Sequence, residues 1–430
     1  MQIDFHYYCI GILARAAGFS DKDAMTIAYA SQYVDDATEN KHISFTDQQG
    51  NFILKIDPVR TAYFGLKAND WSIHKRVFIP FHFIPPEPFD YIHPRSYLDP
   101  DDFVTMPGSP FGTILLRKAA QDDNPKRRLC RIGIALHTYA DTWSHQGFSG
   151  RESEKENALG DIDIWEDGWI PDRFTDQTIE FFTTLIAEET GHGEAGLLPD
   201  ISFLKWRFRK VLSSDSSERD NVEVFYKAAK SIYNELGAIV DQLKETDPSS
   251  FKDPIPWHEI SHNLYQCFQD RGEIGDKFSF WDKLDMYTKK DGLEMRCQKW
   301  MDTFSKHFCT PTIYSAYDRT SWRNLALNPN LRDPDYNPAE VSWHSSVGDE
   351  MSAISPYEGV WSHEKWVQWE NDFRYDYDFD NESLAWDNWS EKKFERQAKF
   401  ILKPEFRDSL WVHFHRAALE QRNIVLEHLP

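Results

Sequence analysis

The sequence is poor in cysteine, in basic residues and in long apolar runs. Among its 430 residues there are only 5 cysteines, and a scattered set of odd number does not predict a disulfide framework. The first residues contain neither a basic region nor the hydrophobic core of a signal peptide. No apolar run approaches the length that crosses a bilayer. These features favour a protein of the reduced cytoplasm that has no transmembrane segment.

Basic residues are also outnumbered by acidic ones, 48 to 70, which gives a formal net charge of −22. Such a charge repels nucleic acids and anionic membranes in general, so an anionic substrate would need bound cations or a local basic patch. Aromatic residues, in contrast, are abundant, with 16 Trp, 18 Tyr and 30 Phe, and a chain of this length can bury a large core. We therefore expect a folded protein, and the charge alone assigns it no function.

The clearest predicted helix covers residues 125–146. Asn124 can cap it, Pro125 can occupy its first position and Gly147 can end it. Apolar residues repeat at helical spacing along one face, which predicts that the helix is anchored in a core. These residues are Leu129, Ile132, Leu136, Tyr139 and Trp143.

Three metal-binding side chains share a second face of this helix. At about 100° per residue, His137, Asp141 and His145 fall within an arc of roughly 80°. Two imidazoles and a carboxylate are ligands that zinc favours, and small neighbours such as Gly133 and Ala140 leave room for an ion. The alternative is a buried network of hydrogen bonds between His and Asp without metal.

Further ligands are expected upstream of this helix. Asp4 can cap a first helix over residues 5–17, and His6 then lies in its first turn. A second helix begins at Ser20, and its inward stripe continues to Asp35, whereas Asp36 turns about 100° away. His82 is the single imidazole of an apolar run. Asp35 and His82 are either metal ligands or ordinary buried polar groups.

Downstream, Gly191–Gly196 contains His192 and Glu194 between glycines that let the backbone approach an ion. A helix end with an incidental histidine is the alternative. An amphipathic helix is predicted over residues 175–190, a loop over 151–174 and a β-hairpin within 42–66.

The composition changes near residue 250, where Trp, Tyr and Asp become frequent. We therefore predict a metal-binding helical core over residues 1–250 and an aromatic-rich region over 251–430 that packs on it. Within the second region, residues 375–380 alternate as a strand does, and residues 405–429 have the pattern of a final amphipathic helix.

A short protease-like pattern, His258, Glu259 and His262, follows Pro256. Two histidines one turn apart with a Glu between them match a zinc protease motif, but so short a pattern often arises by chance. It also begins where a helix only starts, and no clear third ligand follows. A zinc metalloprotease is therefore a rival prediction of low weight.

The candidate ligands, in chain order, resemble those of the zinc-dependent phospholipase C and P1 nuclease superfamily. They are Asp4, His6, Asp35, His82, His137, Asp141, His145, His192 and Glu194. His137 and Asp141 correspond to the superfamily's His-x-x-x-Asp helix, and the four-residue step to His145 is more like the Het-C-related branch. In the superfamily the processed amino terminus is a ligand, and here Asp4 is expected in its place. The last ligand pair is expected to be His192 and Glu194. The opening of the chain and the segment from Leu136 also resemble an uncharacterised bacterial family.

This resemblance implies a mainly α-helical protein that holds two or three zinc ions in a cleft and hydrolyses a phosphodiester. The zinc ions would lower the pKa of a shared water and stabilise the phosphoryl oxygens, and Asp35 would bridge ions or orient the attacking hydroxide. A phospholipid, a nucleotide and a single-stranded nucleic acid all remain open as substrates, and so does the oligomeric state. A non-catalytic protein in which metal joins the helices is the main alternative.

Overall fold

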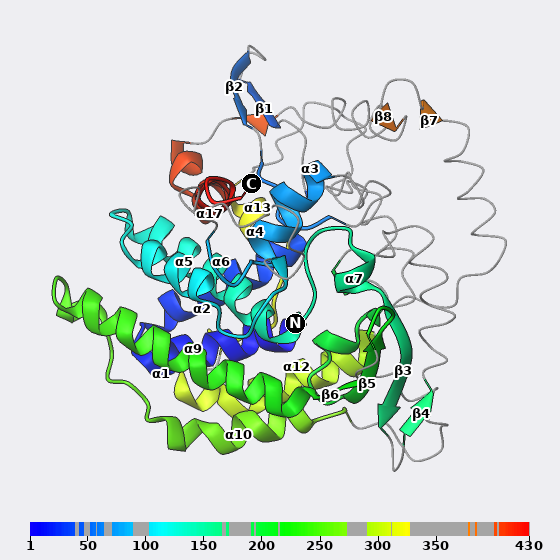
Figure 1. Ribbon diagram of the computed structural model, residues 1–430. Helices are drawn as coiled ribbons and strands as arrows, with labels where there is room; N and C mark the ends of the chain where they lie inside the picture. Colours follow the sequence, from blue (N-terminus) through cyan, green and yellow to red (C-terminus); the bar gives the residue numbers. More distant parts are fainter. Residues whose placement is uncertain are drawn as a thin grey trace.

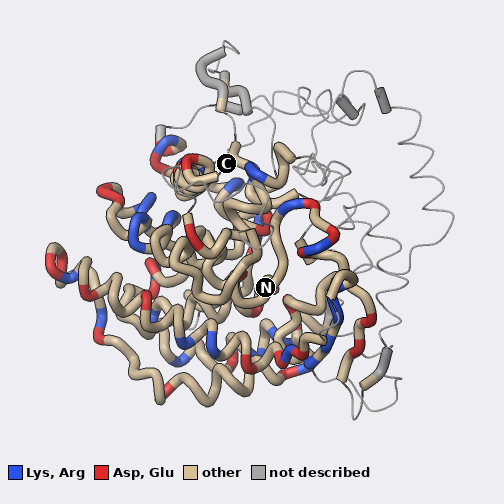
Figure 2. The backbone as a smooth tube through the Cα atoms, viewed as in Figure 1, with Lys and Arg blue, Asp and Glu red and all other residues tan. Residues whose placement is uncertain are grey.

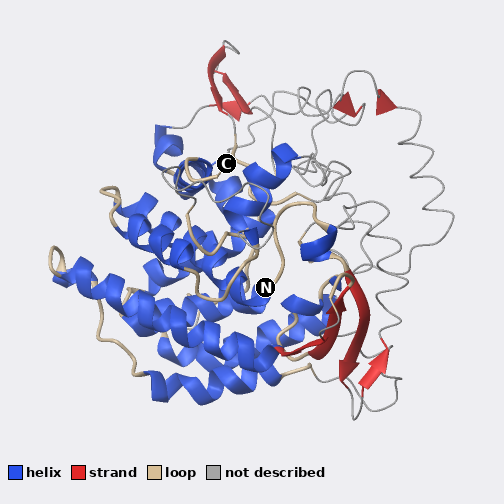
Figure 3. Ribbon diagram, viewed as in Figure 1, coloured by secondary structure: helices blue, strands red, loops and turns tan. Residues whose placement is uncertain are grey.

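The computed structural model describes residues 1–38, 43–46, 52–56, 58–63, 71–88, 103–165, 169–171, 191–192, 195–213, 216–272, 290–310, 312–326, 377–378, 383–384, 400–401 and 404–429. Helices fill most of this part of the molecule, and a four-stranded sheet lies along one edge (Figures 1 and 3). The prediction of a mainly α-helical fold is confirmed.

The longer helices are α1 (Ile10–Ala17), α2 (Asp21–Asp36), α5 (Pro110–Ala120), α6 (Pro125–Ser144), α9 (Asn221–Lys244), α10 (Trp257–Gln269), α12 (Lys290–Phe304) and α17 (Leu410–Leu426). A π-helical turn, η1 (Asp4–Cys9), leads directly into α1. The shorter elements include α3 (Trp71–Ile73), η2 (His74–Phe78), α4 (Ile79–Phe81), α7 (Glu154–Asn157), η5 (Leu198–Asp200), α13 (Ser321–Ala326) and η9 (Pro404–Asp408).

The predicted caps of the second and third helices are confirmed, but Asp4 does not cap the first: η1 begins at Asp4 itself, and its N-cap is Ile3. The Ser20 side chain accepts the backbone N–H of Asp23 at the start of α2, and Asn124 accepts that of Arg127 at the start of α6. Gly147 follows α6 with a φ of 81°, a conformation that residues with a Cβ rarely adopt. Local chemistry therefore sets both ends of the helix that carries the candidate ligands.

The predicted β-hairpin is present as β1 (Ile43–Thr46) and β2 (Phe52–Ile56), which pair antiparallel. The prediction of a loop over residues 151–174 is wrong, because this range contains α7, β3 (Leu159–Trp165) and β4 (Trp169–Pro171). With β5 (Lys205–Lys210) and β6 (Ser216–Asp220) these strands form a sheet of order β4-β3-β5-β6. Leu159 and Ile164 of β3 are buried with Trp206 and Phe208 of β5 on one face of this sheet. The segment forms a strand despite its polar composition because these few apolar residues can be buried on one face.

One hydrophobic core joins helices from both halves of the chain. It includes Phe5, Leu136 and Leu236, and also Trp300 of α12 and Trp411 of α17. The final helix, α17, buries Phe414, Ala417, Ala418 and Val425 in this core, as predicted. A second cluster lies beneath the four-stranded sheet. The division of the chain near residue 250 stays a prediction.

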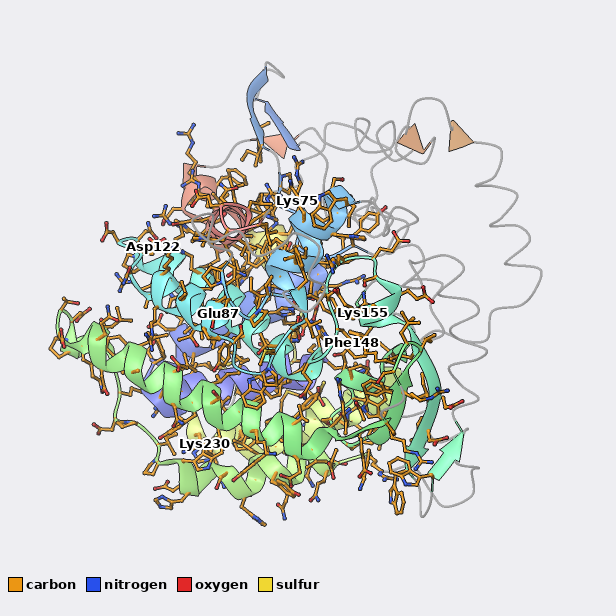
Figure 4. The ribbon with its side chains drawn as sticks, in the orientation of Figure 1. Lys75, Glu87, Asp122, Phe148, Lys155 and Lys230 are labelled. Carbon is orange, nitrogen blue, oxygen red and sulfur yellow. The ribbon has the colours of Figure 1, made fainter. Side chains whose placement is uncertain are left out.

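The basic residues at the start of α6 are held by carboxylates. Asp122 lies 2.5 Å from Nε of Arg127 and 3.4 Å from Nη1 of Arg131, and Lys126 pairs with Asp408. Figure 2 shows basic and acidic segments side by side at the turn between α5 and α6, and Figure 4 labels Asp122 there. This end of α6 is therefore a network of ion pairs, and its cations already have partners.

Two further predictions concern residues 375–380 and 175–190. Tyr377–Asp378 forms the short strand β7, which pairs with β8 (Ser383–Leu384). The amphipathic helix expected over residues 175–190 lies outside the described residues. None of the described helices is long and apolar enough to cross a membrane.

Candidate metal centre

The ligand-bearing helix α6 lies directly against the backbone of α2. A Cβ on Gly133 would come within 2.4 Å of the carbonyl oxygen of Ile27 and 2.6 Å of Cβ of Ala30, so only glycine permits this approach. One turn further along α6, Nδ1 of His137 is 2.9 Å from the carbonyl oxygen of Ser31. Close packing of the two helices therefore fixes the ring of His137.

Asp141 is the residue around which the first group of ligands gathers. Its Oδ2 lies 3.2 Å from Nδ1 of His82 and 3.2 Å from Nε2 of His137. These two ring nitrogens are themselves 3.2 Å apart. Asp35 completes the arrangement, with Oδ1 3.6 Å from Nε2 of His137 and 3.9 Å from Nδ1 of His82.

The other oxygen of Asp141 faces a different set of donors. Oδ1 lies 2.8 Å from the amino nitrogen of Met1 and 3.1 Å from Nε2 of His6. The rings of His6 and His137 are stacked with centroids 3.8 Å apart. Asp141 is thus placed between two groups of nitrogen atoms, with one carboxylate oxygen directed at each. We call Met1, His6, Asp35, His82, His137 and Asp141 the Asp141 group.

A neighbouring set, the Asp200 group, consists of His145, His192 and Asp200. Nε2 of His145 is 3.1 Å from Oδ1 of Asp200, and Nε2 of His192 is 3.4 Å from Oδ2. The two groups adjoin, because the amino nitrogen of Met1 is 2.9 Å from Oδ1 of Asp200. Nδ1 of His145 is also 3.8 Å from Oδ2 of Asp141.

Backbone carbonyls orient four of the histidine rings. The carbonyl acceptors are Ser31 for Nδ1 of His137, Thr61 for Nε2 of His82, His82 for Nδ1 of His145, and Gly196 for Nδ1 of His192, at 2.9 Å each. A carbonyl oxygen only accepts hydrogen bonds, so each of these nitrogens carries a proton, which in a neutral ring leaves the lone pair on the other nitrogen. The lone pair of each ring therefore points into the cluster, as in histidines whose second nitrogen is held while the first binds a metal.

This orientation is unfavourable unless a cation lies between the rings. In their neutral forms, His82 and His137 aim two acceptor nitrogens at each other and at an acceptor oxygen of Asp141, each pair 3.2 Å apart. A tetrahedral zinc ion with bonds of about 2.0–2.1 Å separates its ligands by about 3.3–3.4 Å. The donor set and its spacing therefore fit a zinc ion.

The electrostatics of the cluster show how strongly its charges interact. Burial lowers the pKa of His6 and of His192 to about 4 and that of His137 well below its usual value. Burial also lowers the pKa of His82, but its hydrogen bond to Asp141 and the charge of Asp141 raise it more. In the absence of a cation, a proton on His82 would thus relieve the contact between the two acceptor nitrogens.

The carboxylates respond in opposite directions. Burial would raise the pKa of Asp141 and of Asp200, but the Met1 amino group and the neighbouring histidines hold both well below the usual value. Burial raises the pKa of Asp35 to about 8, with repulsion from Asp141 adding to the effect and His82 opposing it. Burial would lower the pKa of the Met1 amino group, but the charges of Asp141, Asp200 and Asp35 raise it to about 11.

One side of the cluster reaches the surface. The side chains of His6 and His137 are fully buried, whereas that of Asp35 is 30% exposed. His82, His192 and Asp200 are 12%, 16% and 12% exposed. The ligands His6 and His137 are therefore closed to solvent, whereas Asp35 keeps the largest accessible surface of the group.

The structure gathers seven of the nine predicted ligands, namely His6, Asp35, His82, His137, Asp141, His145 and His192. Asp4 is not among them, because its Oδ2 lies 3.6 Å from Nε of Arg296 and 3.4 Å from the hydroxyl of Ser202. Glu194 lies outside the described residues.

Two groups in the cluster were not predicted. Asp200 closes the short turn η5, in a loop sequence without periodicity, and its position eight residues after His192 is the only sequence signal that points to it. The amino group of Met1 comes close to Asp141 and Asp200, where Asp4 had been expected to substitute for it.

The protease-like pattern lies elsewhere. His258, Glu259 and His262 are exposed on α10, whose opposite face buries Ile260 and Leu264. In the described part of the chain no third ligand forms a metal-binding group with them. The pattern therefore lacks the ligand set that a catalytic zinc site requires.

A family model described as "Family of unknown function (DUF6765)" matches residues 1–429. No curated protein and no solved structure shows significant similarity to the chain.

Proposed function

The chain belongs to the DUF6765 family, for which no function is described, and we propose that it is a zinc-dependent phosphodiester hydrolase of the phospholipase C and P1 nuclease type. The observation that carries this proposal is the convergence of acceptor atoms in three His/Asp groups, all within 4.8 Å of one another in each group. Their order along the chain is also the ligand order that the superfamily resemblance implies.

We assign two ion positions to the Asp141 group and one to the Asp200 group. His82, His137, Asp141 and Asp35 supply two nitrogens and two oxygens at the first position. The Met1 amino group, which would give up a proton to bind an ion, supplies the second position with His6 and Asp141, and His145, His192 and Asp200 supply the third. Asp141 would then be shared between the first two positions, since each of its oxygens faces a different set.

Zinc ions bound close together lower the pKa of water, bind phosphoryl oxygens and stabilise a leaving oxygen. The chain's own contribution is to orient and to exclude water. Backbone carbonyls fix the histidine rings, and the buried inner side formed by His6 and His137 keeps solvent away from the shared carboxylate.

Asp35 is the residue that we assign to proton transfer. Its side chain lies at the exposed edge of the centre, where a phosphodiester and an attacking water can reach it. The carboxylate oxygen of Asp35 that does not face the histidines would take the proton that the attacking water loses. Nearby cations would keep it ionised before that step.

A metal that only joins helices is the alternative, and the exposed edge argues against it. Structural zinc sites are closed, and their four positions are filled by protein ligands. Here the outer residues of the cluster keep part of their surface open to solvent, which leaves access for a substrate. The net charge of −22 is no obstacle, because the local field at such a centre is set by its ions.

The test is hydrolysis by protein that has been stripped with chelator and reloaded with zinc. The substrates are bis(p-nitrophenyl) phosphate, phosphatidylcholine vesicles and a single-stranded DNA oligonucleotide, which represent the three open substrate classes. We expect zinc-dependent cleavage of at least one, lost in His137→Ala and retained in Glu259→Gln. Zinc binding without cleavage of any diester would favour the structural role, and zinc-dependent cleavage of casein that Glu259→Gln abolishes would favour the protease.

A further inference from the structure

Arg219 is a half-buried arginine next to the Asp200 group. It lies on β6, and its Cζ is 4.9 Å from the ring centroid of Phe208 and 5.3 Å from the ring centroids of Phe148 and Trp206. In the described part of the chain no carboxylate lies within ion-pair distance of it. Burial lowers the pKa of Arg219 to about 9, so the guanidinium stays charged at neutral pH. Figure 4 labels Phe148 at the end of α6, on the side of the sheet.

The polar partners of Arg219 are backbone carbonyls at the end of α6. Nη1 donates a hydrogen bond to the carbonyl oxygen of Ser144 at 3.1 Å, and Nη2 donates one to that of Gln146. The last carbonyls of a helix lack partners within the helix and carry the negative end of its dipole, so a cation there is stabilised. Gly147, at φ 81°, then turns the chain away, and a Cβ there would lie 3.3 Å from Nη2 of Arg219.

These two carbonyls are on either side of His145. The ring of His145 is already held by three contacts: the carbonyl of His82, the carboxylate of Asp200, and the ring of Phe83 stacked at 4.6 Å. The ring can direct the lone pair of Nε2 at an ion in the Asp200 group only if the backbone of His145 is held in place as well. A single planar guanidinium fixes that backbone on both sides, and a flexible ammonium would do so less rigidly.

We propose that Arg219 is a positioning residue for the Asp200 group, acting through the backbone of His145. This inference rests on the proposed function, because it assumes that the Asp200 group binds a metal ion. Arg219 is no ligand and touches no substrate in this proposal; it determines how tightly one ion of the centre is held. Loss of a residue that orients a metal ligand weakens metal binding by about 10–100-fold.

The experiment is a titration of chelator-stripped, full-length protein with Co²⁺, which counts the bound ions and reports ligand geometry through its visible absorption. Arg219→Met removes the charge and both donors but keeps an apolar chain of similar length. Arg219→Lys keeps the charge, and it tests the proposal if the Met variant does not fold. Arg209→Met is the matched control, because Arg209 is an exposed cation on the adjacent strand that pairs with Asp161.

We expect one Co²⁺ ion to bind about 10–100-fold more weakly in Arg219→Met, with its absorption band altered and the remaining ions unaffected. Arg219→Lys should recover part of the affinity, and Arg209→Met should match the wild type. If the folded Arg219 variants bind every ion as the wild type does, or lose all ions equally, the positioning role is wrong. If the wild type itself binds no Co²⁺, the proposed function fails as well, so the two failures are distinguishable.

Discussion

Replacement of Asp141 by Asn tests the shared carboxylate most severely. The change keeps the size of the side chain and removes its charge, while Oδ1 faces Met1 and His6, and Oδ2 faces His82 and His137. Both positions that use Asp141 should lose affinity, and the Asp200 group should still bind. We therefore expect the number of zinc ions per chain to fall to about one.

The effect on stability follows from linkage. An ion present at 100 times its Kd stabilises the native state by about 2.7 kcal/mol, so the loss of two ions removes roughly 5 kcal/mol of zinc-dependent stabilisation. The substitution Asp141→Asn would also leave the Met1 amino group with one carboxylate partner instead of two, which destabilises the metal-free protein too. The informative quantity is therefore the difference in unfolding free energy with and without zinc.

The assay is chemical denaturation of both proteins in zinc and in chelator, together with calorimetric titration of zinc. Asp122→Asn is the matched control: it breaks a buried ion pair at the other end of α6 and should destabilise the protein without changing its gain from zinc. If Asp141→Asn binds as much zinc as the wild type and gains as much stability from it, the reasoning about the shared carboxylate is refuted.

Four other changes have defined outcomes. Residues added ahead of Met1 should displace its amino group from Asp141 and lower the zinc content by one ion in elemental analysis, whereas a carboxy-terminal tag should not. Arg296→Met leaves Asp4 buried without its cation and should cost about 3–5 kcal/mol in urea unfolding, and an unchanged midpoint would contradict the pairing. Burial lowers the pKa of His415 to about 3, so its protonation opposes folding below the unfolded pKa of about 6.5. The free energy of unfolding should therefore fall by about 2 kcal/mol between pH 6.5 and 5. His415→Gln should flatten this part of the pH profile, and an equal slope in both proteins would exclude His415 as its cause. Gly133→Ala should push α6 away from α2, so that the variant unfolds more easily and binds less zinc than the wild type at equal concentration.

The sequence was sufficient for the parts of the fold that depend on local chemistry. The helix α6 could be predicted because a cap, an early proline and a terminal glycine agree with its apolar stripe, and three of its polar residues share a face. Helical spacing also favours Asp35 over Asp36 as the neighbour of the ligands on α6, and Asp35 does lie in a His/Asp group. Local rules settle such positions without knowledge of the partner helix.

What the sequence could not supply depends on contacts between distant segments. Asp4 had the right position near the amino terminus, but Arg296, nearly three hundred residues later, pairs with it instead. Asp200 lies in a turn without a periodic pattern, so nothing local indicates that it points at His145. The strand β3 was hidden by acidic residues on its outer face, and only pairing with β5 reveals its inner face.

The most direct test of the metal centre is elemental analysis of untagged protein that has been purified without chelator, run beside His137→Ala. His137 is a ligand of the first ion position, and its ring stacks on His6 of the second, so its loss should be visible in the metal content of the whole chain. The account predicts two or three zinc ions per wild-type chain and fewer in the variant. A wild-type protein without metal, or a metal content that His137→Ala leaves unchanged, would show that α6 carries a hydrogen-bonded polar network and would contradict the phosphodiesterase proposal.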